Sequence, residues 1–248
     1  MSILKKIPIR YQGELHDIML VNFSVEKAEI LPMLPDIFTP KDFEGRALIS
    51  MVNVKLKKMR PAFLPKGLHF SYQHVAFRLL IEDRKWNADG RDHGIFFLNS
   101  YTNRLPMIWG GRLLTDYRLN RAELWNHKHN LDLRAGDNII RYTIDPVHPP
   151  DNPQQELTQI VGAVDRAYCL WGKQDVRRTQ IVREQWPLQT VNPTSFQTNF
   201  FRTARLEGIF RVPEVIHYHW LPPVSVGSKV DEKNHPSLHP EAINLRYQ

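Results

Sequence analysis

The sequence predicts a β-rich α+β fold built on an antiparallel sheet or barrel with short flanking helices. Segments in which apolar and polar residues alternate outnumber segments with helical spacing. Neighbouring strand candidates are joined by turn-type sequences and not by long helical crossovers. A doubly wound fold requires strands that alternate with longer helices, so the antiparallel arrangement is favoured.

The first elements are an apolar run and a long strand. Residues 18–23 are apolar, and Ser24 fits the N-cap of a helix that would end at Pro35. Residues 47–59 alternate over a long stretch, and the first half of this stretch is apolar on both faces. This pattern predicts a central strand that contacts a helix or lines a barrel.

The middle of the chain predicts a hairpin followed by a short helix. Residues 72–82 and 95–103 both read as strands, and the turn sequence 87–90 lies between them. Residues 105–114 suit a short helix interrupted at Gly110-Gly111. The other predicted elements are a hairpin of residues 117–133 and 138–144, a helix over 157–170, and strands over 179–186 and 214–219, while 196–210 stays ambiguous.

Length and composition fit one intracellular domain. We expect a single domain over residues 1–248, with residues 223–248 as a polar C-terminal arm. Cys169 is the one cysteine, so an intrachain disulfide is excluded. The N-terminus lacks the apolar stretch of a signal peptide, and no apolar run reaches bilayer length. We therefore expect a soluble, cytoplasmic protein with no membrane partner.

The chain is basic, with 33 Lys and Arg against 26 Asp and Glu, which gives a net charge of +7. Such a balance fits nucleic acid, anionic lipid or an acidic small molecule. The densest basic group, Lys55, Lys57, Lys58 and Arg60, is short, which favours a solvated strand end. Because no nucleic-acid motif accompanies it, nucleic-acid binding is kept only as the weaker alternative.

Several sequence stretches follow one another in an order that carries a family resemblance. They are Val21–Val25, Phe43–Ala47, Gly94–Leu98 with Asn103-Arg104 and Trp109–Leu113, and Asp165–Tyr168 followed by Gln185–Gln189 and Ile216–Tyr218. The series, which covers most of residues 15–220, resembles the uncharacterised YqjF-like family of the acetoacetate decarboxylase superfamily. The resemblance implies an antiparallel, cone-like barrel around a ligand cavity.

The lysine chemistry of the better-known relatives has no counterpart here. Acetoacetate decarboxylases form a Schiff base through a lysine, and the resemblance places that lysine shortly after the strand 95–103. This chain has no lysine between Lys85 and Lys128, and Arg112 in that neighbourhood cannot form an imine. The paired Lys57-Lys58 belongs to another strand. We expect no Schiff-base decarboxylation, and the sequence leaves open whether the protein is an enzyme and which residues would be catalytic.

Six residues near the inferred cavity are candidates for ligand binding. Arg104 and Arg112, with Asn103, could clamp a carboxylate or phosphate, and the alternative is a structural arginine that caps carbonyls or pairs with an acid. Trp109 and Tyr101 could wall a pocket or simply fill the core. His16 stands close to where the resemblance places the decarboxylase's substrate-binding arginine.

Two histidine pairs are candidate metal ligands. His127 and His129, and likewise His217 and His219, are two residues apart, so each pair would share one face of a strand. Such pairs could converge on zinc, but no acid or cysteine lies at a spacing typical of zinc ligands. The alternative is that these are scattered surface histidines. We therefore expect no metal and no cofactor.

Two functional hypotheses follow from these observations. The first is a barrel that binds a small anionic or carbonyl-containing ligand, with Arg104 and Arg112 as anchors. The second is a non-enzymatic structural or interaction protein whose barrel is filled by side chains and has no cavity. Homo-oligomers are compatible with either hypothesis.

Overall fold

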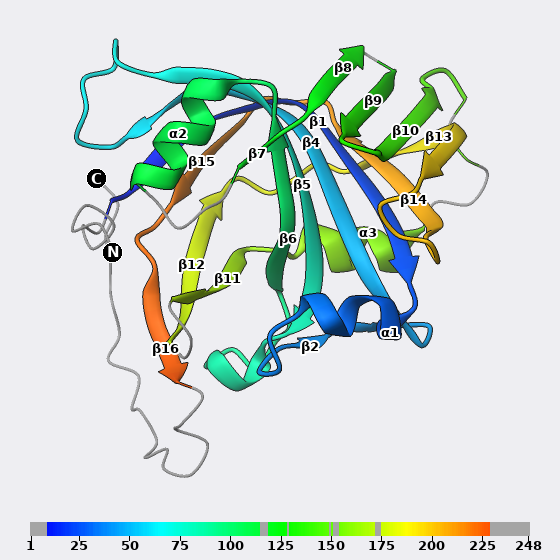
Figure 1. Cartoon of the computed structure of the whole chain (residues 1–248), viewed down its shortest axis with the longest axis horizontal. Coiled ribbons are helices and arrows are strands. Elements are labelled where there is room, and N and C mark those ends of the chain that lie inside the picture. Colours follow the sequence, from blue (N-terminus) through cyan, green and yellow to red (C-terminus); the bar gives the residue numbers. More distant parts are fainter. Residues whose placement is uncertain are drawn as a thin grey trace.

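The computed structural model describes residues 9–114, 119–127, 129–148, 150, 154–171 and 175–228. Strands dominate this part of the chain (Figure 1). The α-helices are α1 (Lys27–Ile30), α2 (Leu105–Leu114) and α3 (Gln155–Gly162), with 3-10 turns η2 (Leu31–Met33) and η3 (Arg84–Trp86). The strands are β1 (Tyr11–Val25), β2 (Thr39–Pro40), β3 (Asp42–Phe43), β4 (Arg46–Pro61), β5 (Phe70–Glu82), β6 (Gly94–Thr102), β7 (Asn120–Arg121), β8 (Glu123–His127), β9 (Asn130–Ala135), β10 (Asn138–Asp145), β11 (Arg166–Trp171), β12 (Asp175–Arg183), β13 (Gln189–Thr198), β14 (Arg205–Val212), β15 (Ile216–Trp220) and β16 (Val224–Ser228).

A closed barrel of seven strands forms the centre of the fold. The ring runs β4–β5–β6–β11–β12–β15–β1, and the pairing of β1 with β4 closes it. All of these pairs are antiparallel except β6 with β11, which run parallel over three residue pairs from Gly94 with Arg166 to Phe96 with Tyr168. The predicted antiparallel barrel is thus confirmed, with one parallel seam in its wall.

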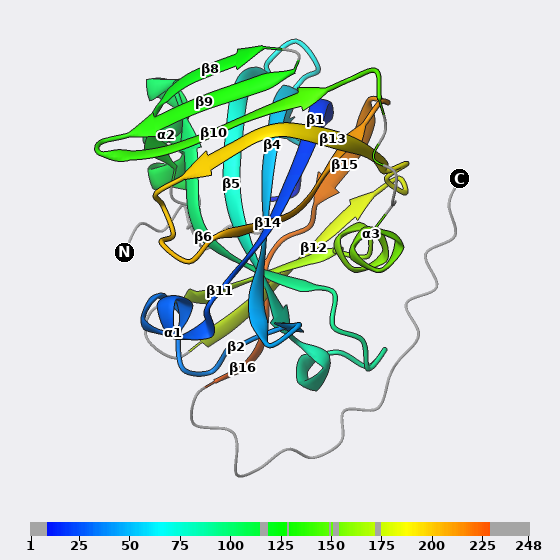
Figure 2. The same ribbon diagram turned by 90° about the vertical axis from the view of Figure 1, so that its right-hand side faces the viewer.

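The strand β1 belongs to two sheets because it changes partner along its length. Its first part, Tyr11–Leu15, pairs with β15, and its later part from Ile18 pairs with β14. The change falls at an irregularity around Asp17, whose φ is +51°, and such bulges bend a strand. A second sheet, β14–β13–β10–β9–β8, continues from β1 and covers one side of the barrel (Figure 2).

Alternation along β4 and β5 separates two hydrophobic cores. The face with Met51, Val75 and Phe77 packs against the second sheet. The opposite face, which includes Val54, Ala76 and Leu80, points into the barrel together with residues of α3. Both faces of this wall are buried, which explains why the sequence of β4 is apolar on both sides.

Most of the predicted elements are confirmed, including the strands over β4, β5 and β6 and the hairpin of β9 with β10. The helix α2 forms over the predicted residues, but it continues through Gly110-Gly111 without the predicted interruption. The helix predicted over residues 157–170 is wrong in its second half. It ends at Gly162, and Arg166–Trp171 forms β11. Apolar spacing alone could not reveal this, because β11 is specified by its pairing with β6 and β12.

Three further predictions need correction. Ser24 is not a helix N-cap: it lies in β1, where its hydroxyl donates to Glu207 and accepts from Arg46. The predicted strand 117–133 is divided among β7, β8 and β9. Part of the expected C-terminal arm forms β16, which pairs with β12. In the described part of the chain, no helix is both long and apolar enough to cross a membrane.

Candidate ligand cavity

The barrel encloses a cavity of about 890 Å³. Its wall is mainly apolar, with Leu15 from β1, Val54 from β4, Ile95 from β6 and Tyr218 from β15 among the lining side chains. A cavity of this size is in the range of small-molecule sites, which combine apolar walls with a few polar groups. The filled barrel of the second hypothesis is therefore not what the described residues form.

One end of the cavity carries two guanidiniums around an indole. Arg78 projects inward from β5, and its guanidinium carbon lies 5.7 Å from the ring centre of Trp186. Arg183, at the end of β12, places its guanidinium carbon 4.2 Å from the same ring. We call Arg78, Trp186 and Arg183 the cationic floor of the cavity.

Neutral acceptors hold both arginines of the cationic floor in place. Arg78 donates to the carbonyl and the hydroxyl of Ser50, at 3.1 and 2.9 Å. Arg183 donates to the carbonyls of Gly162 and Val164, at 3.0 and 2.7 Å, where α3 ends. These bonds fix the direction of the guanidiniums without neutralising their charge.

The charged side chains of the described lining are all arginines, of which Arg177 is paired with Asp175 at 2.8 Å and Arg183 lies near Asp165. Among the described residues that line the cavity, Arg60, Arg78, Arg177 and Arg183 are basic, and none is Asp, Glu or Lys. Burial lowers the pKa of Arg183 to about 10, so its guanidinium stays charged at neutral pH. Burial, and then the nearby Arg78, lower the pKa of His74 to about 4, so this imidazole is neutral.

Two polar atoms at the cavity wall are buried without a hydrogen-bond partner among the described residues. Trp186 is 8% exposed, and its indole N–H donates to no described residue. The hydroxyl of Tyr11, near the other end of the cavity, is also unpartnered. Because an unsatisfied buried donor costs about 1–3 kcal/mol, such a group is a natural contact for a bound ligand.

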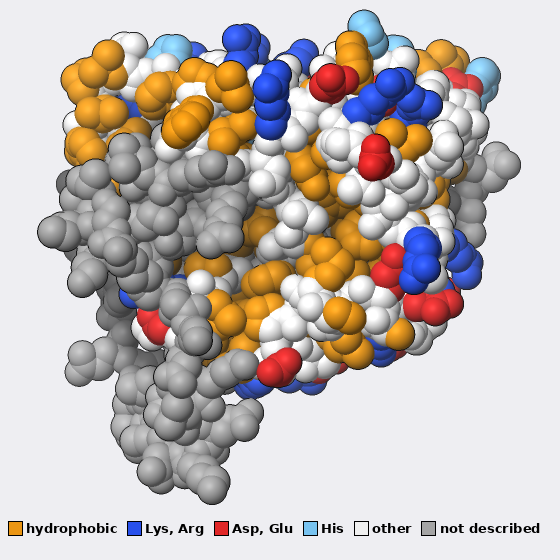
Figure 3. Space-filling view, viewed as in Figure 1, with side chains coloured by type: hydrophobic (Ala, Val, Ile, Leu, Met, Phe, Trp, Pro, Cys, Tyr) orange, Lys and Arg blue, Asp and Glu red, His pale blue; other side chains and the backbone are white. Residues whose placement is uncertain are grey.

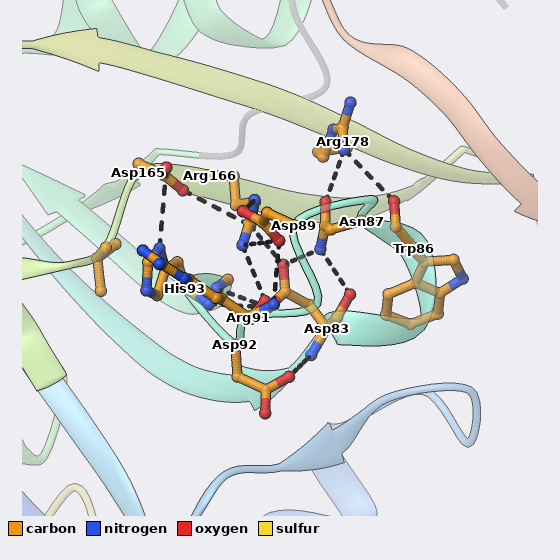
Figure 4. Close-up of polar contacts among 12 residues, drawn as sticks. Asp83, Trp86, Asn87, Asp89, Arg91, Asp92, His93, Asp165, Arg166 and Arg178 are labelled. Atoms are coloured by element: carbon orange, nitrogen blue, oxygen red, sulfur yellow. Dashed lines mark hydrogen bonds and ion pairs between the residues drawn. The ribbon is translucent and has the colours of Figure 1, made fainter. Parts of the chain in front are cut away.

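A polar network secures the parallel seam below the cavity (Figure 4). The fully buried carboxylate of Asp83 accepts from the backbone N–H groups of His93 and Gly94 at 2.9 and 3.1 Å. The hydroxyl of Tyr168 donates to the same carboxylate at 2.8 Å, and Arg166 Nε lies 2.7 Å from it. One carboxylate thus joins the end of β5 to the starts of β6 and β11.

The same network reaches the outer face of β12. The side-chain amide of Asn87 donates to the Asp83 carboxylate at 2.7 Å. The amide oxygen of Asn87 accepts from Arg178 at 2.6 Å. Arg178 also donates to the carbonyl of Trp86 at 3.4 Å. Of the network residues named here, only Tyr168 lines the cavity.

The opposite end of the cavity is its mouth, which we define by Pro61 at the end of β4, by Leu64 of the β4–β5 connection, and by Pro106 and Met107 of α2. The β5 strand runs from this end to the cationic floor. Eight residues separate Phe70 from Arg78, which corresponds to about 26 Å of strand.

Of the two predicted arginine anchors, Arg104 does not line this cavity. Asn103 and Arg104 are exposed at the start of α2, and neither lines the cavity. The side chain of Arg112 lies outside the described residues. Trp109 is 71% exposed on α2. Ligand binding by these four residues stays a prediction, and their positions do not bring them together with the cationic floor.

The other two candidate ligand-binding residues, Tyr101 and His16, contact side chains outside the cavity. Tyr101 is buried and packs against Phe77 and Phe200 in the core under the second sheet. His16 is half-buried on β1, and its ring lies 3.0 Å from the carboxylate of Glu14. Neither residue lines the cavity.

The histidine pairs do not form a metal site in the described part of the chain. His127 ends β8 and His129 lies just before β9, so the two histidines do not belong to one strand. His217 and His219 do share a face of β15. The residue between them, Tyr218, is the one that lines the barrel cavity.

Sequence reasoning missed the residues of the cationic floor. The strand β5 was interpreted from its apolar face, Val75 to Ile81, while His74 and Arg78 alternate on the other face. The sequence signal that could have revealed this site is Arg78, a basic residue within a strand that is apolar on both faces. Trp186 and Arg183 gave no local signal, because only the fold brings them next to β5.

Comparison with solved structures identifies the class of fold. Acetoacetate decarboxylase from Legionella pneumophila superposes with a TM-score of 0.59 at 12% identity, over 90% of this chain and 89% of that one. An acetoacetate decarboxylase-like enzyme from Sphingomonas wittichii gives 0.57 at 10% identity, over 91% and 95%. Another acetoacetate decarboxylase structure gives 0.58 at 11% identity, over 90% and 91%. The chain therefore has the acetoacetate decarboxylase-like fold.

The family assignment comes from sequence. Residues 12–224 match DUF2071, a family described as an uncharacterized conserved protein. The match spans most of the chain, and the protein belongs to this family. No curated protein matches the sequence.

Proposed function

We propose that the protein binds an elongated organic anion, such as a carboxylate with an apolar chain, inside the barrel. The charged group would lie at the cationic floor, and the apolar part would extend along the barrel wall toward the mouth. Whether the bound molecule is also transformed is a separate question that the proposal does not require.

The observation that carries this proposal is the indole N–H of Trp186. It is buried, has no hydrogen-bond partner among the described residues, and belongs to a ring that two guanidinium carbons approach to 5.7 and 4.2 Å, in a cavity whose described lining contains no acid. An anionic oxygen could accept from this N–H and interact with the guanidiniums together. Charge-assisted hydrogen bonds of this kind are roughly twice as strong as neutral ones.

The lining also supports the expectation that the chain is not a Schiff-base decarboxylase. Imine formation requires an amine at the reacting carbonyl. No lysine is among the described residues that line the cavity. The likeness to acetoacetate decarboxylase therefore supports a shared barrel fold. The described cavity lining lacks the lysine that Schiff-base chemistry would need.

Calorimetry with decanoate and decanamide tests the proposal, because the two probes differ in charge and share the chain. We expect decanoate to bind at least tenfold more tightly than decanamide. The Trp186→Phe variant keeps an aromatic ring but loses the donor, and should weaken decanoate binding about tenfold, equivalent to ~1.4 kcal/mol. Trp125→Phe, on the second sheet, is the matched control and should bind as the wild type does.

Two results would refute the proposal. Equal affinity for the acid and the amide would show that the site does not select an anion. Unchanged decanoate binding in a folded Trp186→Phe variant would remove the indole N–H from the site.

A further inference from the structure

Large apolar side chains are exposed on both sides of the mouth. On the β4–β5 connection, Phe63 is 72% and Leu68 59% exposed, and Phe70 at the start of β5 is 50% exposed. On α2, Leu105 is 47% and Trp109 71% exposed. We call these five residues the mouth patch. Hydrophobic side chains gather over α2 and the β4–β5 connection at the upper left of Figure 3.

The chain segments that carry the mouth patch contain basic but no acidic residues. Residues 55–74 include Lys55, Lys57, Lys58, Arg60 and Lys66, and residues 103–114 include Arg104 and Arg112. Carboxylates of β1 pair with Lys55 and Lys58. Lys66 and Arg104 form no ion pair with the described residues. The surroundings of the patch therefore carry an excess of positive charge.

This charge distribution disfavours a second copy of the chain as the partner. In a two-fold dimer the same patch faces itself, so the basic segments would meet one another. Like charges brought together at an interface cost several kcal/mol. A partner that offers both negative charge and an apolar layer matches the patch better.

An anionic lipid surface has both of these properties. Exposed aromatic and leucine side chains enter the boundary between headgroups and acyl chains, while lysine and arginine interact with anionic headgroups. The mouth patch surrounds the opening of an apolar cavity, so docking would turn that opening toward the lipid. Nucleic acid would satisfy the charge but gives no reason for Leu68 and Leu105 to be exposed.

We propose that the mouth patch docks the protein peripherally on anionic lipid surfaces. The proposal stands on the exposed surface and does not require the cavity to bind a carboxylate. The docking would be reversible, since it depends on a few side chains and on charges that salt screens.

Co-sedimentation of the full chain with vesicles tests this proposal. Vesicles of phosphatidylcholine with phosphatidylglycerol should bind the protein, vesicles of phosphatidylcholine alone should bind it much less, and high salt should weaken the binding. The double variant Phe63→Ser/Trp109→Ser should lower the partition coefficient at least about tenfold. Val147→Ser removes an equally exposed side chain elsewhere (72%) and should change nothing.

A second variant and two companion measurements keep the outcome decisive. Lys66→Glu should weaken vesicle binding without changing the melting temperature, because the side chain is exposed. Absence of vesicle binding, or equal binding by the folded double variant, would overturn the proposal. It would equally be overturned if sedimentation velocity showed a dimer that the double variant abolishes. Binding to a generic oligonucleotide, lost in the double variant and without vesicle binding, would assign the patch to nucleic acid.

Discussion

At the scale of single residues, the barrel interior combines a strongly apolar wall with charged and titratable groups. His74 is the clearest example, because its imidazole is buried and stands near the guanidinium of Arg78. Both effects oppose protonation, and they hold the pKa of His74 at about 4, against 6.5 for an exposed histidine. The neutral form adds no further positive charge to a lining that is already cationic.

The pKa of His74 predicts a pH-dependent stability. Between pH 6.5 and 4 the unfolded chain binds a proton at this position and the folded chain does not. The free energy of unfolding should therefore fall as the pH decreases through this window, with a contribution from His74 of up to about 3 kcal/mol. Above pH 6.5 the contribution is constant.

Urea unfolding of the wild type and of His74→Gln, measured across this pH window, isolates the effect. The difference between the two proteins should change with pH in the acidic range and level off at neutral pH. A difference that stays constant from pH 4 to 7 would show that His74 titrates normally in the folded protein.

At the scale of elements, the parallel seam of β6 and β11 depends on close packing at Gly94. A Cβ at this position would lie 2.7 Å from Asp83 Cγ and 2.7 Å from Tyr168 Cε2. Both of these groups belong to the polar network that joins β5, β6 and β11. A larger residue at Gly94 would therefore displace the network as well as the seam.

We expect Gly94→Ala to lower the free energy of unfolding by about 1–3 kcal/mol, the usual cost of overpacking. Gly67→Ala is the matched control, since no atom lies within 4 Å of its added Cβ. Chemical denaturation measures both variants. Equal stability of the two would mean that the seam tolerates a side chain and that the network is not a constraint.

The local pattern of apolar residues predicts those strands that are buried against a core on both faces. The strands β4, β5 and β6 are such elements, because their inward and outward faces are both visible in the sequence. The strand β11 was not predictable in this way, since the spacing of Val161, Val164 and Tyr168 fits a helix as well. Its identity is decided by Gly94–Phe96, some seventy residues earlier in the chain.

At the scale of the whole molecule, the barrel and its cavity followed from the antiparallel pattern and the family resemblance, whereas the cationic floor did not. Arg78 is distant in the sequence from Arg183 and Trp186, and backbone carbonyls at the end of α3 position Arg183. The sequence drew attention to Arg104 and Arg112 because they follow the strand that carries the chemistry in relatives. In the described cavity, the charged end is instead formed by Arg78 and Arg183.

The lining also predicts how the protein responds to a ketone. Incubation with acetoacetate and borohydride should leave the mass of the protein unchanged, because no described lysine lines the cavity to form an imine. An acetoacetate decarboxylase treated in parallel should gain the reduced adduct. Mass spectrometry reads both results, and an adduct on this chain would show that a lysine reaches the carbonyl.

The most direct test of the account is a crystal structure with an ω-bromo derivative of decanoate, in which anomalous scattering marks one end of the ligand. The account predicts the carboxylate within about 3 Å of Trp186 Nε1 and a guanidinium of Arg78 or Arg183, with the bromine on the side of the mouth. A ligand bound in the reverse direction, or outside the barrel, would contradict it.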